Sequence, residues 1–474
     1  MSEVLLPACR IDAAGKRHVD FRALLRIATP LMLSNAIQAL LNLTDTWFIG
    51  HISTAAVAAI SAIYWLLSCL ILLFGGVGLA VQSFVSQADG AGRRARASQS
   101  LWNGLWASLA AVPAFLIAAA LGRPLLTFVG VDPEVRDLAV AFWEPRMSGA
   151  FLGAITWALM SFFNGIGATR ITFLTALVTL LVNVAANQVF IFDLGWGIAG
   201  SAWATNLAQA VGVVLGLVLL LREPFAARYR TRLTIRPRWA MVRRQLAVGF
   251  PVGAMYAADV LGLALMQLMI AQVGNVGAAA TQIVIMLTSI AYMPGLGLAS
   301  AGTTVVGQAI GAGDRDWAAH LGTVVIRSCA FFMFAIASSI LIAGPWLLPT
   351  FLAPDDPSSA ATVETALLLL WPAAAYQLFD GLYFGSSFCL RATGDTAVPA
   401  AAALVLSWGF NVPLAHTLVF TPEQAWVPGL PQFGLGALGG WLALMVYVVL
   451  LGSYMYRRWR SERWRKVDLW GRAA

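Results

Sequence analysis

Three aspartates lie well inside long apolar stretches of this sequence, where a charged side chain is costly. They are Asp45, Asp259 and Asp380. If these stretches cross a lipid bilayer as helices, a carboxylate at the centre costs roughly 2.5–3.5 kcal/mol and normally faces a cavity on an ion or substrate path. We find no lysine or arginine in the middle of such a stretch that could neutralise them, and we place Arg146 near an end. The three acids are therefore predicted to bind a coupling ion or a cationic substrate.

Other polar side chains stand near these acids at helical spacing. Tyr376 precedes Asp380 by one turn, so a phenol and a carboxylate share one face and the phenol could donate to the acid or add an oxygen ligand around a cation. Asn183 and Asn187 form a second pair at the same spacing, in the half that contains Asp45. Buried amides need partners in hydrocarbon, and a carboxylate is the expected one.

Enzyme signatures are missing from the sequence. The four histidines and four cysteines show no metal-ligand spacing, and no glycine-rich loop with a lysine could hold a nucleotide phosphate. The paired acids Asp355 and Asp356 are flanked by prolines, which favours a turn over a metal site. We therefore predict a protein that is not an enzyme, has no cofactor and holds no metal, except possible Na⁺ at Asp380, Tyr376 and Asp259.

The composition places the chain in a membrane. Of 474 residues, 59% are hydrophobic and 11% are charged, whereas soluble domains carry about 25% charged residues. The net charge of +8 comes from arginines that flank the apolar stretches. This distribution is typical of cytoplasmic membrane loops and excludes a nucleic-acid-binding surface.

The apolar stretches predict twelve membrane helices in an all-α fold. With a cytoplasmic N-terminus, all of the 30 lysines and arginines except Arg123, Arg136 and Arg146 fall on the cytoplasmic side. Both termini of this multi-pass protein are thus expected in the cytoplasm of a bacterial cell, with the helices in its inner membrane. The predicted helices are 24–49, 54–86, 99–122, 136–164, 169–193, 197–222, 245–270, 276–308, 319–348, 361–390, 395–420 and 434–457.

The two halves of the sequence repeat each other. Val85-Ser-Gln-Ala-Asp-Gly-Ala-Gly92 matches Val306-Gly-Gln-Ala-Ile-Gly-Ala-Gly313, and Pro30 matches Pro251 at the same offset. Six helices per repeat preserve orientation, so the halves are parallel repeats, an arrangement typical of alternating-access transporters with a site between the halves. The predicted parts are a cytoplasmic tail (1–23), a six-helix bundle (24–222), a basic linker (223–244), a second bundle (245–457) and a basic tail (458–474).

Two further sets of residues are candidates for the transport cycle. Pro30 and Pro251 lie inside predicted helices, where proline removes a backbone donor and bends the helix, so each is either a fixed kink or a hinge. Methionines and tyrosines of the seventh and eighth helices could form an adaptable apolar cavity wall, although packing is the more usual role for such side chains. They are Met255, Tyr256, Met286, Tyr292 and Met293.

At these residues the chain resembles the MATE family, the multidrug and toxic compound extrusion transporters. The resemblance covers nearly the whole chain. Its main segments are Pro30 to Asp45-Thr-Trp-Phe-Ile-Gly50, the two repeated VxQAxGAG segments, Gly197-Ile-Ala-Gly-Ser-Ala-Trp-Ala-Thr205 and Arg391-Ala-Thr-Gly-Asp-Thr396. It implies twelve helices in two bundles around a V-shaped cleft, and export of cationic or aromatic compounds in exchange for H⁺ or Na⁺.

The resemblance also assigns individual residues. Asp45 is similar to the family's ion-binding acid in the first helix, and Asp380 with Tyr376 to the cation-site residues of the NorM-like branch. Asp259 stands where that branch usually has Glu. Asn187 stands where the DinF-like branch commonly has Asp, so a relay of two carboxylates is not expected there. The chain is nearest the NorM-like branch, with some DinF-like features.

The expected function is therefore secondary antiport by a monomer that contacts membrane lipids and small cationic or aromatic substrates, and no nucleic acid. A lipid-linked oligosaccharide flippase of the same superfamily is the first alternative. It would have a large basic cleft and often fourteen helices, whereas we predict twelve helices and no arginine in the middle of a span. A membrane-embedded enzyme and a passive channel are less consistent with two repeats that each bury acids.

Overall fold

The computed structural model describes residues 6–129, 132–352, 357–427 and 429–471. Before the first helix, β1 (Cys9–Ile11) and β2 (Arg17–Val19) form a small antiparallel hairpin that the sequence did not lead us to expect in the N-terminal tail. Its Arg17 pairs with Asp314 at 2.6 Å, which fixes the hairpin to the second half of the chain.

The first half of the chain contains six long helical segments. The third is divided into α3 and α4, the fourth is bent by 42° between α6 and α7, and the fifth ends in the π-helical segment η1. The elements are α1 (Phe21–Gly50), α2 (Thr54–Gly90), α3 (Arg94–Ala110), α4 (Val112–Ala120), α5 (Gly122–Val129), α6 (Pro133–Ser148), α7 (Ala150–Gly165), α8 (Thr169–Asn187), η1 (Gln188–Asp193) and α9 (Gly197–Leu221).

The second half repeats this order after the short linker elements α10 (Phe225–Tyr229) and η2 (Thr231–Leu233). Again the fifth segment contains a π-helical stretch, η4. The elements are α11 (Trp239–Val273), α12 (Asn275–Gly311), α13 (Arg315–Leu347), η3 (Leu348–Phe351), α14 (Ser359–Thr393), α15 (Ala397–Leu406), η4 (Ser407–Asn411), α16 (Val412–Val419), α17 (Gly436–Arg460) and η5 (Arg463–Lys466).

These helices agree with the predicted membrane spans. Within the described ranges, ten helices are long and apolar enough to cross a membrane, and the bent pair α6 and α7 makes an eleventh. The remaining long helix, α14, has 35 residues and contains Gln377 and Asp380, and it falls outside this set. With α14 the described chain has the twelve segments that the sequence predicts.

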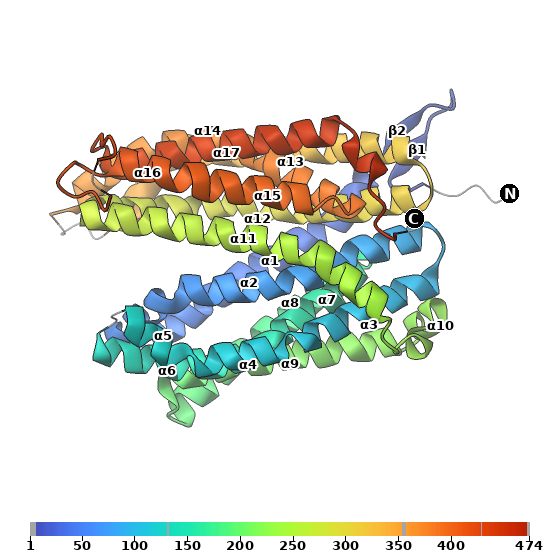
Figure 1. Ribbon diagram of the computed structural model, residues 1–474, viewed down its shortest axis with the longest axis horizontal. Helices are drawn as coiled ribbons and strands as arrows, with labels where there is room; N and C mark the ends of the chain where they lie inside the picture. Colours follow the sequence, from blue (N-terminus) through green and yellow to red (C-terminus); the bar gives the residue numbers. More distant parts are fainter. Residues whose placement is uncertain (1–5, 130–131, 353–356, 428, 472–474) are drawn as a thin grey trace.

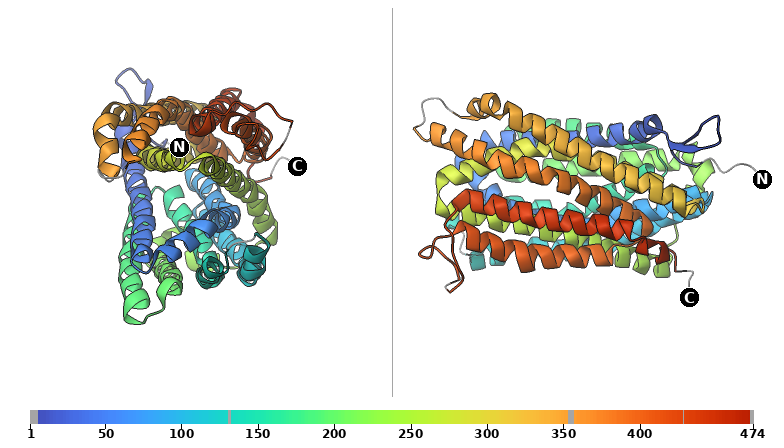
Figure 2. Two further views of the ribbon diagram at one scale, coloured as in Figure 1. Left: turned by 90° about the vertical axis from the view of Figure 1, so that its left-hand side faces the viewer. Right: turned by 90° about the horizontal axis from the view of Figure 1, so that it is seen from above.

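The two halves form two bundles that lie side by side along the long axis of the molecule (Figures 1 and 2). The first helix of each bundle packs on the second helix of the other bundle: α1 packs on α12, and α11 packs on α2. Glycine permits both crossings. A Cβ on Gly76 would lie 2.3 Å from the backbone nitrogen of Gly253, and one on Gly297 would lie 2.5 Å from that of Met32. The repeat in the sequence is therefore also a repeat in the contacts.

The bundles are also in contact at the end of the molecule that carries both termini, which we call the terminal end (Figure 1). Here the two VxQAxGAG segments meet. A Cβ on Gly90 would lie 2.0 Å from the carbonyl oxygen of Gln308, and one on Gly311 would lie 2.1 Å from that of Gln87. The C-terminal segment adds a bridge, since Trp470 donates to Gln87 at 3.1 Å. The cleft between the bundles is therefore closed at this end.

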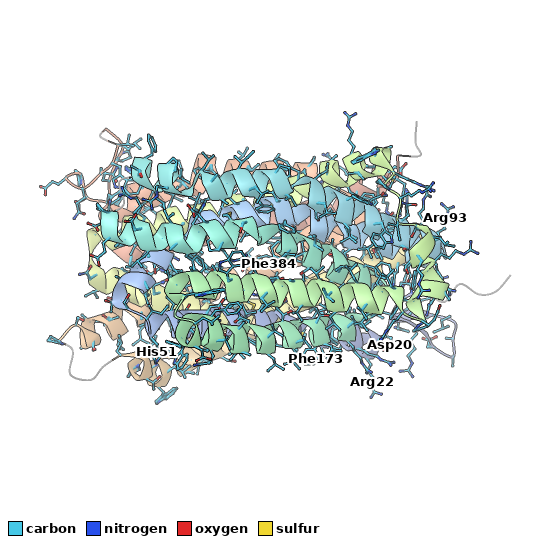
Figure 3. All side chains as sticks on the ribbon, turned by 90° about the horizontal axis from the view of Figure 1, so that it is seen from below. Asp20, Arg22, His51, Arg93, Phe173 and Phe384 are labelled. Atoms are coloured by element: carbon cyan, nitrogen blue, oxygen red, sulfur yellow. The ribbon has the colours of Figure 1, made fainter. Side chains whose placement is uncertain are left out.

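Charged and polar residues mark the two ends of the bundles. In Figure 3, Asp20, Arg22 and Arg93 lie at the terminal end, and His51 lies at the opposite end. This distribution is that of a protein whose apolar middle sits in a bilayer.

Candidate functional site

A cavity of about 680 Å³ lies between the two bundles. The first half contributes residues of α1, α2, α7, α8 and α9, and the second half contributes residues of α11, α12, α14 and α17. Somewhat more than half of its lining residues are apolar or aromatic, and the rest are mostly Ser, Thr, Asn and Gln. Such a lining offers both apolar contacts and hydrogen-bonding groups to a small organic molecule.

In the first half, Asp45 is the centre of a polar cluster. Asn187 donates to Asp45 Oδ1 at 2.6 Å, and Thr205 donates to Oδ2 at 3.3 Å. Asn187 also donates to Asn183 Oδ1 at 3.1 Å, so both predicted amides belong to the same network. Both asparagines are fully buried, and none of these four residues lines the central cavity. The cluster thus brings together residues of α1, α8 and α9.

This cluster is rich in oxygen atoms. In addition to the Asp45 carboxylate, Asn187 Oδ1 and Ser201 Oγ are buried and have no hydrogen-bond partner. Carboxylate, amide and hydroxyl oxygens are the ligands that hard cations prefer. Among the described residues, no group of three or more His, Cys, Asp or Glu side chains could hold a metal ion. The chemistry here suits a proton or a single small cation such as Na⁺.

One expectation about this cluster is wrong. We expected no basic residue in the middle of a span, with Arg146 near a helix end. Instead Arg146 lies just before the bend between α6 and α7, in the middle of the fourth segment, and it interacts electrostatically with Asp45. The predicted helix 136–164 already contained Arg146 ten residues after its start, so the expectation of a position near an end underestimated its depth, and the bend between α6 and α7 was not visible in the sequence.

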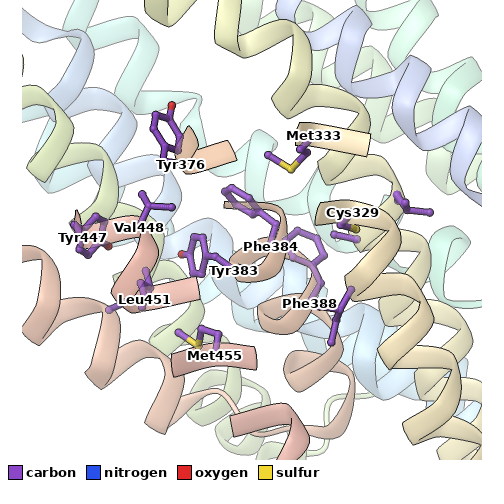
Figure 4. Packing of buried hydrophobic residues seen from close by; sticks show 14 of the residues in the cluster. Cys329, Met333, Tyr376, Tyr383, Phe384, Phe388, Tyr447, Val448, Leu451 and Met455 are labelled. Atoms are coloured by element: carbon purple, nitrogen blue, oxygen red, sulfur yellow. The ribbon is translucent and has the colours of Figure 1, made fainter. Parts of the chain in front are cut away.

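In the second half, Asp259 is held by two phenols. Tyr383 of α14 donates to Asp259 Oδ2 at 2.7 Å, and Tyr447 of α17 donates to Oδ1 at 2.5 Å. Both tyrosines are buried, and they are seen on their two helices in Figure 4. All three residues line the cavity. Sequence reasoning missed both tyrosines, because they are far from Asp259 in the chain and no local spacing links them.

Asp380 also lines the cavity, but its surroundings differ. It is 9% exposed and close enough to Asp259 for the two carboxylates to interact. The spacing of Tyr376 and Asp380 suggested that the phenol donates to the carboxylate. In the described part of the structure, these two residues form no hydrogen bond with each other. Tyr376 instead stacks on Trp441, with ring centroids 6.2 Å apart and planes at 28°. Tyr376 and Asp380 therefore share the cavity wall without being bonded.

The two π-helical segments lie beside the acids of their halves. Segment η1 begins directly after Asn187, the donor to Asp45. Segment η4 begins at Ser407, which donates to the carbonyl oxygen of Ala258 at 3.4 Å, next to Asp259. π-Helical turns are rare and frequently occur at functional sites. Each half thus distorts its fifth helical segment next to a buried acid.

The predicted cavity wall is only partly correct. Tyr256, Tyr292 and Met293 line the cavity, and Tyr292 packs edge-on against Phe384 with centroids 4.9 Å apart. Met255 is 3% exposed in the core of the second bundle, and Met286 is 52% exposed on its surface, so neither belongs to the wall. Helical spacing marks a face, but it does not tell which neighbour covers that face. Pro30 and Pro251 lie inside the continuous helices α1 and α11, and their role as hinges stays a prediction.

A second arginine was also misplaced. Arg391, expected in a loop, lies within α14, lines the cavity and is 3% exposed. Among the lining residues that the structure describes, Arg391 is the only base and shares the cavity with the carboxylates of Asp259 and Asp380, so the cavity is not the large basic cleft expected of a flippase. The expectation of twelve helices rather than fourteen also agrees with the structure.

Comparison with known proteins identifies the family. The MatE family model matches residues 30–189 and again residues 251–417, so its two matches begin at Pro30 and Pro251. This protein belongs to the MatE family. It is therefore a membrane transporter and not an enzyme.

Curated relatives and solved structures agree with this assignment. The chain is 30% identical over 458 residues to the probable multidrug resistance protein NorM of Burkholderia pseudomallei, covering 94% of this chain and 95% of that protein. It is 28% identical to the NorM protein of Rhizobium meliloti, covering 94% and 93%. A multidrug resistance MATE family transporter of the MOP superfamily, solved in an outward-facing conformation, superposes with a TM-score of 0.79 at 18% identity, covering 92% and 94%. The MATE fold expected from the sequence is thus confirmed.

Proposed function

We propose that this transporter exports cationic aromatic compounds across a bacterial inner membrane in exchange for H⁺ or Na⁺. The observation that carries the proposal is the cavity between the bundles, whose aromatic wall contains the carboxylates of Asp259 and Asp380. Aromatic faces and buried negative charge attract organic cations. Relatives named for multidrug resistance agree with such a broad substrate range.

Export against a gradient requires a coupled ion, and the buried acids are the groups that can bind it. An ion changes the cycle only if it binds the two conformations with different affinity. Asp259 and Asp380 line the cavity, so a proton or Na⁺ that neutralises them weakens their hold on a cationic substrate directly. Asp45 lies outside the cavity, so its ion acts through the packing of α1, which crosses to α12 of the other bundle.

A transport assay with separate gradients tests this function. Purified protein is reconstituted into liposomes, ethidium is supplied as the aromatic cation, and a pH gradient or a Na⁺ gradient is imposed alone. One of the two gradients should drive ethidium movement, and reversing that gradient should reverse the movement. Asp12→Asn is the matched control, because Asp12 is an exposed carboxylate in the turn between β1 and β2. Ethidium movement that ignores both gradients contradicts antiport.

A direct ion-binding measurement tests the role of the acids in the second half of the chain. Asp380→Asn should lose coupling-ion binding there, because an amide cannot supply the negative charge. Unchanged ion affinity of purified Asp380→Asn would remove Asp380 from the ion site.

The proposed orientation places the terminal end of the molecule in the cytoplasm, as the distribution of arginine predicts. In this orientation the contacts at the terminal end close the cleft on the cytoplasmic side. Reporter fusions at residue 471 should be active only in the cytoplasm, and periplasmic activity would reverse the orientation. We propose that the transporter acts as a monomer. Light scattering of the purified protein tests this, and a stable dimer would contradict it.

A further inference from the structure

The cavity also contains a buried positive charge that antiport of simple cations does not use. Arg391 lines the cavity and is 3% exposed. Its Nη2 donates to Thr303 Oγ1 at 3.5 Å, a long contact. Its Nε and Nη1 are buried and have no hydrogen-bond partner among the residues that the structure describes. Leaving buried donors unsatisfied costs free energy, and more so for a charged group.

The surroundings of this guanidinium contain no compensating acid. Within the described ranges Arg391 forms no ion pair, and its polar neighbours include Tyr256, which lies within hydrogen-bonding reach, and Cys389. The guanidinium carbon lies 4.1 Å from the centroid of the Phe388 ring, so one face of the group is covered by an aromatic ring. A cation–π contact holds the group in position but leaves its N–H donors unused. These donors are therefore available to an acceptor that enters the cavity.

Arg391 and the acids place opposite charges at two different levels of the cavity. Asp380, Phe384, Phe388 and Arg391 all belong to α14 and all line the cavity. Their spacing of four, four and three residues places them on one face of the helix. Eleven residues separate Asp380 from Arg391, which corresponds to roughly 16 Å along the helix axis. Arg391 lies nearer the closed terminal end, and the two phenylalanines lie between the opposite charges.

We propose that Arg391 forms an oxyanion-binding subsite at the closed end of the cavity, which accepts the carboxylate of aromatic substrates whose cationic part faces Asp259 and Asp380. The inference rests on the proposed export of aromatic cations and extends it to zwitterions. A guanidinium suits this role because its planar fork can donate two parallel hydrogen bonds to a carboxylate. The subsite makes Arg391 a specificity-determining residue.

Two dyes that share one aromatic cation test the subsite. Rhodamine 110 carries a free carboxylate, and rhodamine 123 carries the same group as a methyl ester. Binding of each dye to the purified protein is measured by fluorescence polarisation. Arg391→Gln should weaken rhodamine 110 binding by roughly tenfold or more, the effect of losing a charge-assisted hydrogen bond. Rhodamine 123 binding should change by less than about twofold, because the ester carries no charge for the guanidinium to pair with.

Controls separate this role from a structural one. Arg391→Lys keeps the charge and should retain part of the preference for rhodamine 110. Arg315→Gln removes an arginine that donates to a backbone carbonyl at the terminal end, outside the cavity, and should alter neither dye. If Arg391→Gln weakens both dyes equally, or weakens neither, the subsite is refuted.

A measurement on the unmodified protein keeps the proposal testable if Arg391→Gln does not fold. Naphthalene-2-carboxylate should displace rhodamine 110 at a lower concentration than naphthalene-2-carboxamide does, because only the carboxylate pairs with the guanidinium. Equal competition by the two compounds refutes the subsite. Failure of gradient-driven ethidium movement, with the dye preference intact, instead refutes antiport and leaves the subsite standing.

Discussion

The two halves of this transporter bury their acids in different chemical surroundings. In the first half, Asp45 is bound by an amide and an aliphatic hydroxyl, and its cluster lies outside the cavity. In the second half, Asp259 is bound by two phenols, Asp380 lies beside it, and both acids line the cavity. Both arrangements stand beside a π-helical segment. The repeat therefore preserved the backbone arrangement while the polar side chains diverged.

This difference separates two ways of coupling an ion to a substrate. The cluster around Asp45 lies outside the cavity, so the effect of an ion bound there must pass through helix packing. The acids of the second half are reached from the cavity, so ion and substrate can compete for the same charge. The predictions below test this division, beginning with the largest expected effect.

Replacing Asp45 should have the largest effect on transport. Asp45→Asn removes the only carboxylate of its cluster, so gradient-driven ethidium efflux should fall to the level of protein-free liposomes. Binding of ethidium to the purified variant should change by less than about threefold, because an interaction outside the site contributes little to binding. Efflux at the wild-type rate, at equal protein content, would remove Asp45 from the coupling mechanism.

Replacing Asp380 should show the opposite pattern in the binding assay. Asp380→Asn removes a buried charge from the cavity wall, and ethidium affinity should fall by roughly tenfold or more, as for other desolvated charge interactions. Fluorescence titration of the purified variant measures this. If Asp45→Asn and Asp380→Asn lower ethidium affinity equally, the distinction between the two halves fails.

The phenols of the second half offer a matched pair of substitutions. Tyr447→Phe removes a hydrogen bond to the Asp259 carboxylate, which should cost roughly 1.5–3 kcal/mol of stability. Tyr376→Phe removes a hydroxyl that makes no hydrogen bond to either acid, so its cost should be smaller. Thermal unfolding of the two variants in the same detergent compares them, and equal shifts would show that the Tyr447 contact is not energetically important.

The smallest effect should come from the longer hydrogen bond to Asp45. Thr205 donates at 3.3 Å and Asn187 at 2.6 Å, so Thr205 contributes less to holding the carboxylate. Thr205→Val should slow ethidium efflux by about two- to fivefold, corresponding to one weak hydrogen bond. Asn187→Leu should slow it more. The reverse order would show that the hydroxyl, and not the amide, is the main partner of Asp45.

Much of the architecture could be read from the sequence because lipid leaves few alternatives. Every backbone polar group must be bonded within its own segment, so an apolar stretch of sufficient length has to be a helix. The repeated glycines and prolines showed two parallel halves, and the cost of burying charge singled out Asp45, Asp259 and Asp380. These inferences depend on composition and local spacing, which the sequence contains in full.

The tertiary structure decided which of these residues meet. Tyr383 and Tyr447 reach Asp259 from two other helices, at separations of 124 and 188 residues, and no local pattern encodes such pairs. Met255 and Met286 are candidates by spacing, yet one is buried in the bundle and the other faces outward. Arg391 lies within α14 because that helix extends to Thr393, beyond its predicted end, and Arg146 lies beside a bend that no local pattern shows. The sequence by itself determined the helices, their repeat and the cost of burying each charge. Only the packing of helices distant in the chain decided which side chains contact each buried charge.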